Sequence, residues 1–156
     1  ILGVCLGAQL VADAIGGRGY LGKHGYEIGY VQYELTSHGK DDPVISKVFQ
    51  EYENKPSLVM HHKDSFDLPS HASVLAYTSN NYIAAFRIGS ALGVQFHPEA
   101  SYADFNRWVE RTRILKPKAY EHLDVDEILR HGQANEIHAG KSRETFFEHW
   151  WNSLHI

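Results

Sequence analysis

Apolar residues follow two different spacings along the chain, and these spacings predict an alternation of strands and helices. The chain opens on Ile1-Leu2-Gly3-Val4, which predicts the end of a buried strand over residues 1–4. Apolar positions then recur three and four residues apart, which predicts a helix over residues 7–15 that stops at Gly16-Gly17. The apolar positions at helical spacing are Leu6, Leu10, Val11, Ala14 and Ile15.

The middle of the chain is rich in β-branched and aromatic residues, which predict strands. We expect five of them, at residues 28–35, 57–61, 74–78, 82–88 and 92–96. The pair Asn80-Asn81 predicts a tight hairpin turn, because asparagine tolerates a positive φ, and Gly89-Ser90 predicts a second turn. The glycine-rich residues 18–25 are expected to form a loop.

Helix start signals recur in the remaining segments. Asp42-Pro43 predicts a cap followed by a short helix through Phe49. Ser101, with Asp104 three residues later, predicts a capping box at the start of a helix that runs through Ile114 and is stopped by Lys116-Pro117. Two further helices are expected at residues 126–130 and 143–154. The last one carries an aromatic stripe, which predicts either a packing face or an exposed contact face: Phe146, Phe147, Trp150 and Trp151.

The mixture of strands and helices indicates an α/β fold in a single domain over residues 1–156, with a helical C-terminal tail of unassigned role at residues 116–156. The chain has 156 residues, of which 43% are hydrophobic, so a core can form. A formal charge of -4 argues against nucleic acid or an anionic membrane as a partner. No apolar run approaches the roughly 18 residues that a membrane-spanning helix needs.

The chain holds one cysteine, Cys5, so an intramolecular disulfide is excluded and a reducing, cytoplasmic location is expected. Its one methionine is Met60, and the chain opens on an apolar residue without the charged region of a signal peptide. We therefore expect a processed protein or a partial domain that begins partway through its fold.

The strongest chemical signal is Gly3-Val4-Cys5-Leu6-Gly7, in which a predicted strand runs into a predicted helix through a cysteine. This is the cysteine version of a nucleophile elbow. The turn is expected to be so sharp that side chains at positions 3 and 7 would clash. The helix N-terminus favours a thiolate at Cys5, and the backbone N–H of Leu6 is well placed to bind an oxyanion. The alternative is that Cys5 is a small buried hydrophobic residue.

The second signal is Gly93-Val94-Gln95-Phe96-His97-Pro98-Glu99. His97 stands at the end of an apolar strand, and Glu99 follows a proline that fixes the backbone. A cysteine nucleophile needs a base, and the base needs an acceptor that orients it. Cys5, His97 and Glu99 supply these three roles, although any one of 11 histidines could reach a strand end by chance.

Together the two motifs resemble the signatures of class I glutamine amidotransferases. Residues 26–30 and 60–64 resemble segments of the branch that includes the glutaminase domain of GMP synthase and its stand-alone relatives. The resemblance covers roughly residues 1–115. It implies a flavodoxin-like open sheet of which the opening strands are missing from this chain.

The resemblance implies a catalytic triad of Cys5, His97 and Glu99 that hydrolyses the side-chain amide of glutamine through a thioester. Leu6 would supply one oxyanion donor through its backbone. The residues expected to bind glutamine are Gln9 and, through their backbone, Glu27, Ile28, Gly29 and Tyr30. A second oxyanion donor would come from a loop before the elbow strand, so we expect this chain alone to be poorly active. No cofactor or metal is implied, and the ammonia would pass to an unknown acceptor on a synthetase partner.

Weaker features have simpler interpretations. His61, His62 and Asp64 resemble a metal site, but neighbours on a strand face opposite ways, so a structural role or a wall of the glutamine pocket is favoured. Residues 16–19 lack the context of a phosphate-binding loop and are assigned to the helix stop. Two alternatives to glutamine hydrolysis remain: cleavage of γ-glutamyl peptides or conjugates by the same triad, and a partner-binding module without catalysis.

Overall fold

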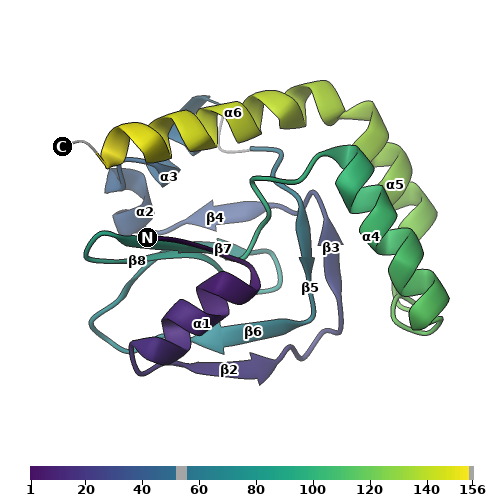
Figure 1. The fold of residues 1–156 in the computed structure, drawn as a ribbon, viewed down its shortest axis with the longest axis horizontal. Helices are drawn as coiled ribbons and strands as arrows, with labels where there is room; N and C mark the ends of the chain where they lie inside the picture. Colours follow the sequence, from purple (N-terminus) through teal and green to yellow (C-terminus); the bar gives the residue numbers. More distant parts are fainter. Residues whose placement is uncertain (52–55, 155–156) are drawn as a thin grey trace.

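The computed structural model describes residues 1–51 and 56–154 of the chain. Its centre is an open five-stranded sheet with the strand order β1-β9-β8-β7-β4 (Figure 1). β1 pairs in parallel with β9, and the other three pairings are antiparallel. The strands are β1 (Leu2–Val4), β4 (Tyr33–Leu35), β7 (Ser73–Thr78), β8 (Ile83–Ile88) and β9 (Ala91–Val94).

Two antiparallel ribbons extend from this sheet. One pairs β2 (Arg18–Leu21) with β6 (Asp64–Asp67), and the other pairs β3 (Glu27–Gly29) with β5 (Met60–His62). In the second ribbon, Ile28 lies opposite His61. The ribbon thereby joins the predicted glutamine pocket to the predicted histidine cluster.

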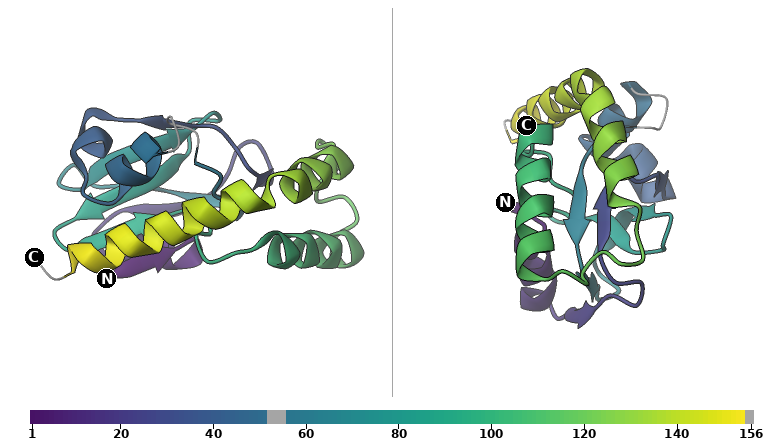
Figure 2. Two further views of the ribbon diagram at one scale, coloured as in Figure 1. Left: turned by 90° about the horizontal axis from the view of Figure 1, so that it is seen from above. Right: turned by 90° about the vertical axis from the view of Figure 1, so that its right-hand side faces the viewer.

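Helices cover both faces of the sheet (Figures 1 and 2). A main core between the sheet, α3 and α6 buries Val48, Phe49, Leu92 and Phe146 completely. On the other face, α1 packs Ala8 and Ala12 against Phe66 and Phe86. The helices are α1 (Leu6–Ala14), α2 (Ser37–Asp41), α3 (Ile45–Glu51), α4 (Tyr102–Leu115), α5 (Val125–Ala134) and α6 (Glu136–Ser153).

A further core lies at one end of the molecule, where α4 and α5 lie together (Figure 2). It packs Ile28 of β3 against Phe105 and Val109 of α4 and Val125 at the start of α5. The segment beyond residue 115 thus packs directly on the ribbon that carries the predicted glutamine pocket.

Several start and stop signals are confirmed. Ser101 and Asp104 form a capping box at the start of α4, and Asp42 Oδ1 accepts hydrogen bonds from the backbone N–H groups of Val44 and Ile45. Asn81 has a φ of 61° in the predicted hairpin turn. α1 ends before Gly16, whose φ is 92°.

Other predictions of secondary structure are wrong. Residues 18–21 form β2 rather than a loop, because they pair with β6. Residues 28–35 are not one strand: the chain turns away after Gly29, and β4 joins another sheet. β6 and α2 were not predicted. The final helix begins at Glu136 instead of residue 143, and residues 155–156 of the predicted tail lie outside the described residues.

The aromatic stripe of α6 divides between two environments. Phe146 is fully buried and Trp150 packs against the same core, whereas Trp151 is 60% exposed and Phe147 is 36% exposed. The packing interpretation therefore holds for Phe146 and Trp150, and a contact role for the exposed part of the stripe stays a prediction. Among the residues described, no helix combines the length and apolar character needed to cross a membrane.

Candidate active site

Cys5 stands at the junction of β1 and α1 in a sharp turn, with a φ of 48° and a ψ of -106°. A positive φ is costly for a residue with a side chain, so this conformation needs support from its surroundings. A Cβ on Gly3 would lie 2.8 Å from the backbone oxygen of Gly7, which confirms the need for glycine at position 3. A Cβ on Gly7 would meet no atom within 4 Å, so the predicted clash at that position is wrong.

Parallel pairing brings the two sequence motifs together. The backbone N–H of Cys5 donates to the carbonyl oxygen of Val94, at 2.8 Å, just where β1 and β9 end. The segment after β9 is then fixed by hydrogen bonds from Gln95 N to Ala84 O and from His97 N to Val59 O, both 2.8 Å. Cys5 and the residues 95–99 therefore leave the sheet at one edge, the carboxyl end of two parallel strands.

His97 is held on two sides. Its Nδ1 lies 2.6 Å from Glu99 Oε1, and its ring packs on Trp108 of α4 with the ring centroids 4.8 Å apart. The His97 side chain is 14% exposed and the Glu99 side chain is 48% exposed. The histidine is thus shielded while its carboxylate partner reaches solvent.

The pKa of His97 is raised to about 9. Burial by itself lowers this pKa, but hydrogen bonding and charge attraction to Cys5 and Glu99 outweigh the burial. A pKa of about 9 means that the imidazole is protonated at neutral pH. The site therefore places a positively charged imidazolium beside the sulfur of Cys5.

Among the described residues, two groups besides His97 interact with the sulfur of Cys5. Gln95 Nε2 lies 3.4 Å from Sγ, and the carbonyl oxygen of His61 lies 3.8 Å from it. Gln95 belongs to the second motif but was given no role from the sequence. The available signal was a glutamine in an apolar strand, because a buried polar side chain needs a partner.

Gln9 lies near the start of α1, and its side chain is beside that of Gln95. Its Nε2 donates to the backbone oxygen of Asp64, at 3.0 Å, and to Gln95 Oε1, at 3.3 Å. The amide nitrogen of Gln9 is thus committed to groups within the chain. A contact between Gln9 and substrate glutamine stays a prediction.

Leu6 begins α1, so its backbone N–H belongs to the first helical turn, where donors have no partner within the helix. The Leu6 side chain is 63% exposed. Its role as an oxyanion donor stays a prediction, and the geometry of the first turn is compatible with it.

The residues expected to line the glutamine pocket lie on and after β3. The Ile28 side chain packs into the core shared with α4, and a Cβ on Gly29, whose φ is 92°, would lie 2.6 Å from Ile128 of α5. The Tyr30 hydroxyl is buried without a hydrogen-bond partner among the described residues, and burial raises its pKa to about 12. These side chains face the helices, which leaves the backbone as the part that can line a pocket.

His61, His62 and Asp64 do not converge. His61 Nε2 lies 2.7 Å from the Tyr120 hydroxyl, whereas His62 Nε2 lies 2.8 Å from Glu27 Oε2. Burial, together with the nearby charge of His97, lowers the pKa of His61 to about 4. His61 is therefore neutral at physiological pH and forms part of the wall beside Cys5.

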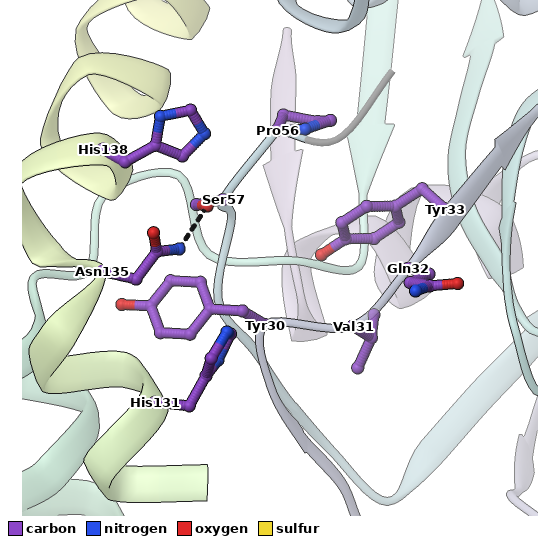
Figure 3. A pocket seen from close by; sticks show the side chains of 9 residues that line it. All are labelled: Tyr30, Val31, Gln32, Tyr33, Pro56, Ser57, His131, Asn135 and His138. Atoms are coloured by element: carbon purple, nitrogen blue, oxygen red, sulfur yellow. Dashed lines mark hydrogen bonds between the residues drawn. The ribbon is translucent and has the colours of Figure 1, made fainter. Parts of the chain in front are cut away.

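A cavity of about 390 Å³ opens between the segments that flank the ribbon of β3 and β5 and the junction of α5 with α6 (Figure 3). In Figure 3, Asn135 Nδ2 donates to Ser57 Oγ across it, at 2.6 Å. The cavity shares Tyr30 with the predicted glutamine pocket, whereas Cys5, His97 and Glu99 lie elsewhere. Its lining consists of Tyr30, Val31, Gln32, Tyr33, Pro56, Ser57, His131, Asn135 and His138.

The chain is 34% identical over 108 residues to a GMP synthase (glutamine-hydrolysing) of Pyrobaculum aerophilum. The aligned segment covers 69% of this chain and 20% of the relative. It is 30% identical over 151 residues to the corresponding protein of Thermus thermophilus, covering 92% of this chain and 27% of the relative. The chain thus spans about a fifth to a quarter of the length of these relatives.

A crystal structure of a glutamine amidotransferase from Thermotoga maritima has a similar fold. It superposes with a TM-score of 0.71 at 29% sequence identity, covering 96% of this chain and 61% of that one. The open α/β sheet expected from the sequence is therefore confirmed. The model of the family described as glutamine amidotransferase class-I matches residues 1–115, and the chain belongs to this family.

Proposed function

We propose that this chain hydrolyses the side-chain amide of glutamine to glutamate and ammonia through a thioester on Cys5. The observation that carries the proposal is the position of Cys5: a cysteine in a strained turn at the N-terminus of α1, beside a histidine that is paired with Glu99. Membership of the amidotransferase family supports the choice of substrate.

In the first half of the reaction, the Cys5 thiolate attacks the side-chain carbonyl carbon of glutamine. The carbonyl oxygen takes up negative charge, and the backbone N–H of Leu6 donates to it. The carbon–nitrogen bond then breaks, and the imidazolium of His97 gives its proton to the departing nitrogen. Ammonia and a γ-glutamyl thioester result, and His97 is left neutral.

In the second half, neutral His97 accepts a proton from a water molecule that attacks the thioester carbon. The carbon–sulfur bond breaks, glutamate leaves and the thiolate–imidazolium pair is restored. Glu99 holds the Nδ1 side of the imidazole throughout and stabilises its charged form. Trp108 limits the rotation of the ring by packing against it at a tilt of 59°.

The ammonia is proposed to pass to a synthetase that uses it in a further reaction. The support is the similarity to the GMP synthases of Pyrobaculum aerophilum and Thermus thermophilus. The acceptor molecule is left open.

The direct test measures glutamate and ammonia released from glutamine by the protein and by its Cys5→Ala and His97→Asn variants. We expect each substitution to lower kcat by at least about a thousandfold, as for other nucleophile–base systems. Lys47→Ala, on the exposed side of α3, serves as a control that should leave turnover unchanged. Equal rates for the protein and Cys5→Ala would exclude Cys5 as the nucleophile.

A competing substrate is a γ-glutamyl peptide, which presents the same carbonyl carbon to Cys5. Hydrolysis of glutamine and of γ-glutamyl dipeptides should therefore be compared through kcat/KM. We expect glutamine to be preferred. A strong preference for the peptides would replace glutamine hydrolysis by γ-glutamyl cleavage as the function.

A further inference from the structure

A continuous series of hydrogen bonds leads from a backbone carbonyl to the sulfur of Cys5. It begins at the backbone oxygen of Asp64, which accepts from Gln9 Nε2, at 3.0 Å. Gln9 Nε2 also donates to Gln95 Oε1, at 3.3 Å, and Gln95 Nε2 donates to Cys5 Sγ, at 3.4 Å. Two side-chain amides thus connect β6, α1 and the segment after β9.

The direction of this series is fixed by its first member. A backbone carbonyl can only accept, so the amide of Gln9 must turn its NH₂ group toward Asp64. The second hydrogen of that NH₂ group then points at Gln95, which must present its oxygen. The Gln95 amide has therefore only its NH₂ group left for Cys5, and the sulfur receives this hydrogen bond, while its own S–H donates to the His61 carbonyl oxygen, at 3.8 Å.

The anchor itself is firmly held. The Asp64 backbone oxygen also accepts from His62 Nδ1, at 2.8 Å, while the opposite side of that imidazole pairs with the buried carboxylate of Glu27. Gln95 is completely buried, and its backbone N–H donates to Ala84 O in the neighbouring strand. The Asp64 carbonyl and the Gln95 side chain are therefore both restrained by their surroundings.

We propose that Gln95 stabilises the Cys5 thiolate by donating a hydrogen bond to Sγ, and that Gln9 is a positioning residue that sets the orientation of the Gln95 amide. An N–H donor aimed at sulfur stabilises the thiolate more than the thiol. It also offsets the loss of the hydrogen bond that the thiol of Cys5 donates to the His61 carbonyl oxygen, at 3.8 Å, because a thiolate has no proton to donate. In catalysis this proposal rests on the proposed function, because it assumes that Cys5 is the nucleophile.

The test measures the rate of iodoacetamide alkylation against pH, without any substrate. Cys5 is the single cysteine of the chain, so alkylation reports on this sulfur alone. The proposal predicts that Gln95→Met moves the midpoint of the alkylation profile upward by about one pH unit, the size expected for losing one hydrogen bond to a charged group. Gln9→Met should move it in the same direction by a smaller amount, because the freed Gln95 amide can then turn.

Gln133→Met makes the same chemical change at an exposed position on α5 and should leave the midpoint in place. The titratable groups around the site are the same in all variants: His97 with Glu99, His61 on β5, the buried pair of Glu27 and His62, and the exposed Asp64. A difference between the Gln95 and Gln133 variants therefore reports on the amide. Thermal unfolding of each variant shows whether it is folded.

An unchanged midpoint in folded Gln95→Met overturns the proposal. If that variant does not fold, Gln9→Met decides, since it leaves the buried Gln95 side chain in place: an unchanged midpoint again overturns the proposal. Glutamine kinetics separate the two roles of Gln9, because a positioning role lowers kcat, whereas a contact with substrate raises KM. If the protein shows the shift but does not hydrolyse glutamine, the proposed function fails and the hydrogen bond to sulfur stands.

Discussion

At the scale of single residues, the elbow depends on the two glycines of its motif in different ways. Gly3 sits against the first turn of α1, where a Cβ would lie 2.8 Å from the Gly7 oxygen. Gly7 lies in open space within the described chain. The sequence motif predicts the same requirement for glycine at both positions. The contacts around each position show that only Gly3 is required for lack of space.

Gly3→Ala is therefore expected to lower the free energy of unfolding by about 1–3 kcal/mol, because the elbow must open to admit a methyl group. Gly7→Ala is expected to change it little or to raise it by up to about 1 kcal/mol, because alanine favours a helix. Urea unfolding of both variants checks the difference. Equal losses at the two positions would show that the close approach at Gly3 does not limit the elbow.

His61 should make the stability of the protein depend on pH. Its pKa is about 4 in the folded state, against an ordinary value of 6.5. Between these two values the unfolded chain binds more protons than the folded one, so stability falls as the pH drops from about 6.5 toward 4.

His61→Phe keeps an aromatic ring beside Tyr26 and Trp108 and removes the titrating group. We expect the free energy of unfolding to fall less steeply with decreasing pH in this variant. The difference in slope should correspond to the binding of up to about one proton on unfolding. Urea unfolding at a series of pH values measures it. His149→Phe, on the later part of α6, is the matched control, and an identical slope in the protein and in His61→Phe would contradict the prediction.

The sequence predicted Cys5, His97 and Glu99 because each follows a strand whose apolar residues are visible in the motifs. It did not predict the contacts of Gln95 and Trp108. Gln95 contacts the sulfur of Cys5, which lies 90 residues away in the chain, and Trp108 reaches His97 from α4. Such contacts depend on tertiary packing, which no local spacing encodes.

At the scale of elements, the ribbon of β3 and β5 is held by a buried carboxylate. Glu27 is 4% exposed and its two oxygens accept from His62 Nε2, at 2.8 Å, and from Asn80 Nδ2, at 2.9 Å. This contact connects the ribbon to the turn between β7 and β8. The ribbon in turn carries the His61 carbonyl that faces Cys5.

Glu27→Gln should lower the free energy of unfolding by about 3 kcal/mol, because a buried polar pair loses one partner. The control is Glu110→Gln, which breaks the exposed contact between Glu110 and Arg113 and should cost less than about 1 kcal/mol. Chemical unfolding of both variants gives the two values. Similar small costs would mean that the ribbon does not depend on Glu27.

The start of α6 shows why some element boundaries escape prediction from sequence. Its first turns bury small residues, Ala139 and Ser142, while Ile137 is 83% exposed. Apolar periodicity is therefore weak until Phe146. β2 escaped for a related reason: its four residues are mostly exposed and are held by pairing with β6, which lies more than forty residues along the chain.

At the scale of the whole molecule, the site draws on three segments that lie far apart in the sequence. Cys5 opens α1, His61 lies on β5, and residues 95–99 follow β9. The segment beyond residue 115, to which no role was assigned from the sequence, packs on β3 through α5. The α/β class followed from the mixture of local patterns, but the order of strands and the role of this segment depend on pairings between distant residues.

Substitutions at Gly29 and Ile128, which lie close together, can test whether the C-terminal helices help to shape the site. Gly29→Ala places a methyl group 2.6 Å from Ile128 Cγ2 and also strains a backbone with a φ of 92°. Ile128→Ala removes the atom that clashes but not the strain. In a double-mutant cycle we therefore expect the two changes together to cost less than their sum, by about 0.5–3 kcal/mol.

Measuring the KM for glutamine in the same variants shows whether the packing of α5 on β3 affects the glutamine pocket. If α5 sets the position of the β3 backbone, Gly29→Ala raises the KM for glutamine and Ile128→Ala partly restores it. The control pair, Gly89→Ala with Ile128→Ala, joins two sites without a shared contact, because a Cβ on Gly89 meets nothing within 4 Å, and it should be additive. Additive effects for Gly29 and Ile128 as well would show that the helices stabilise the fold without shaping the glutamine pocket.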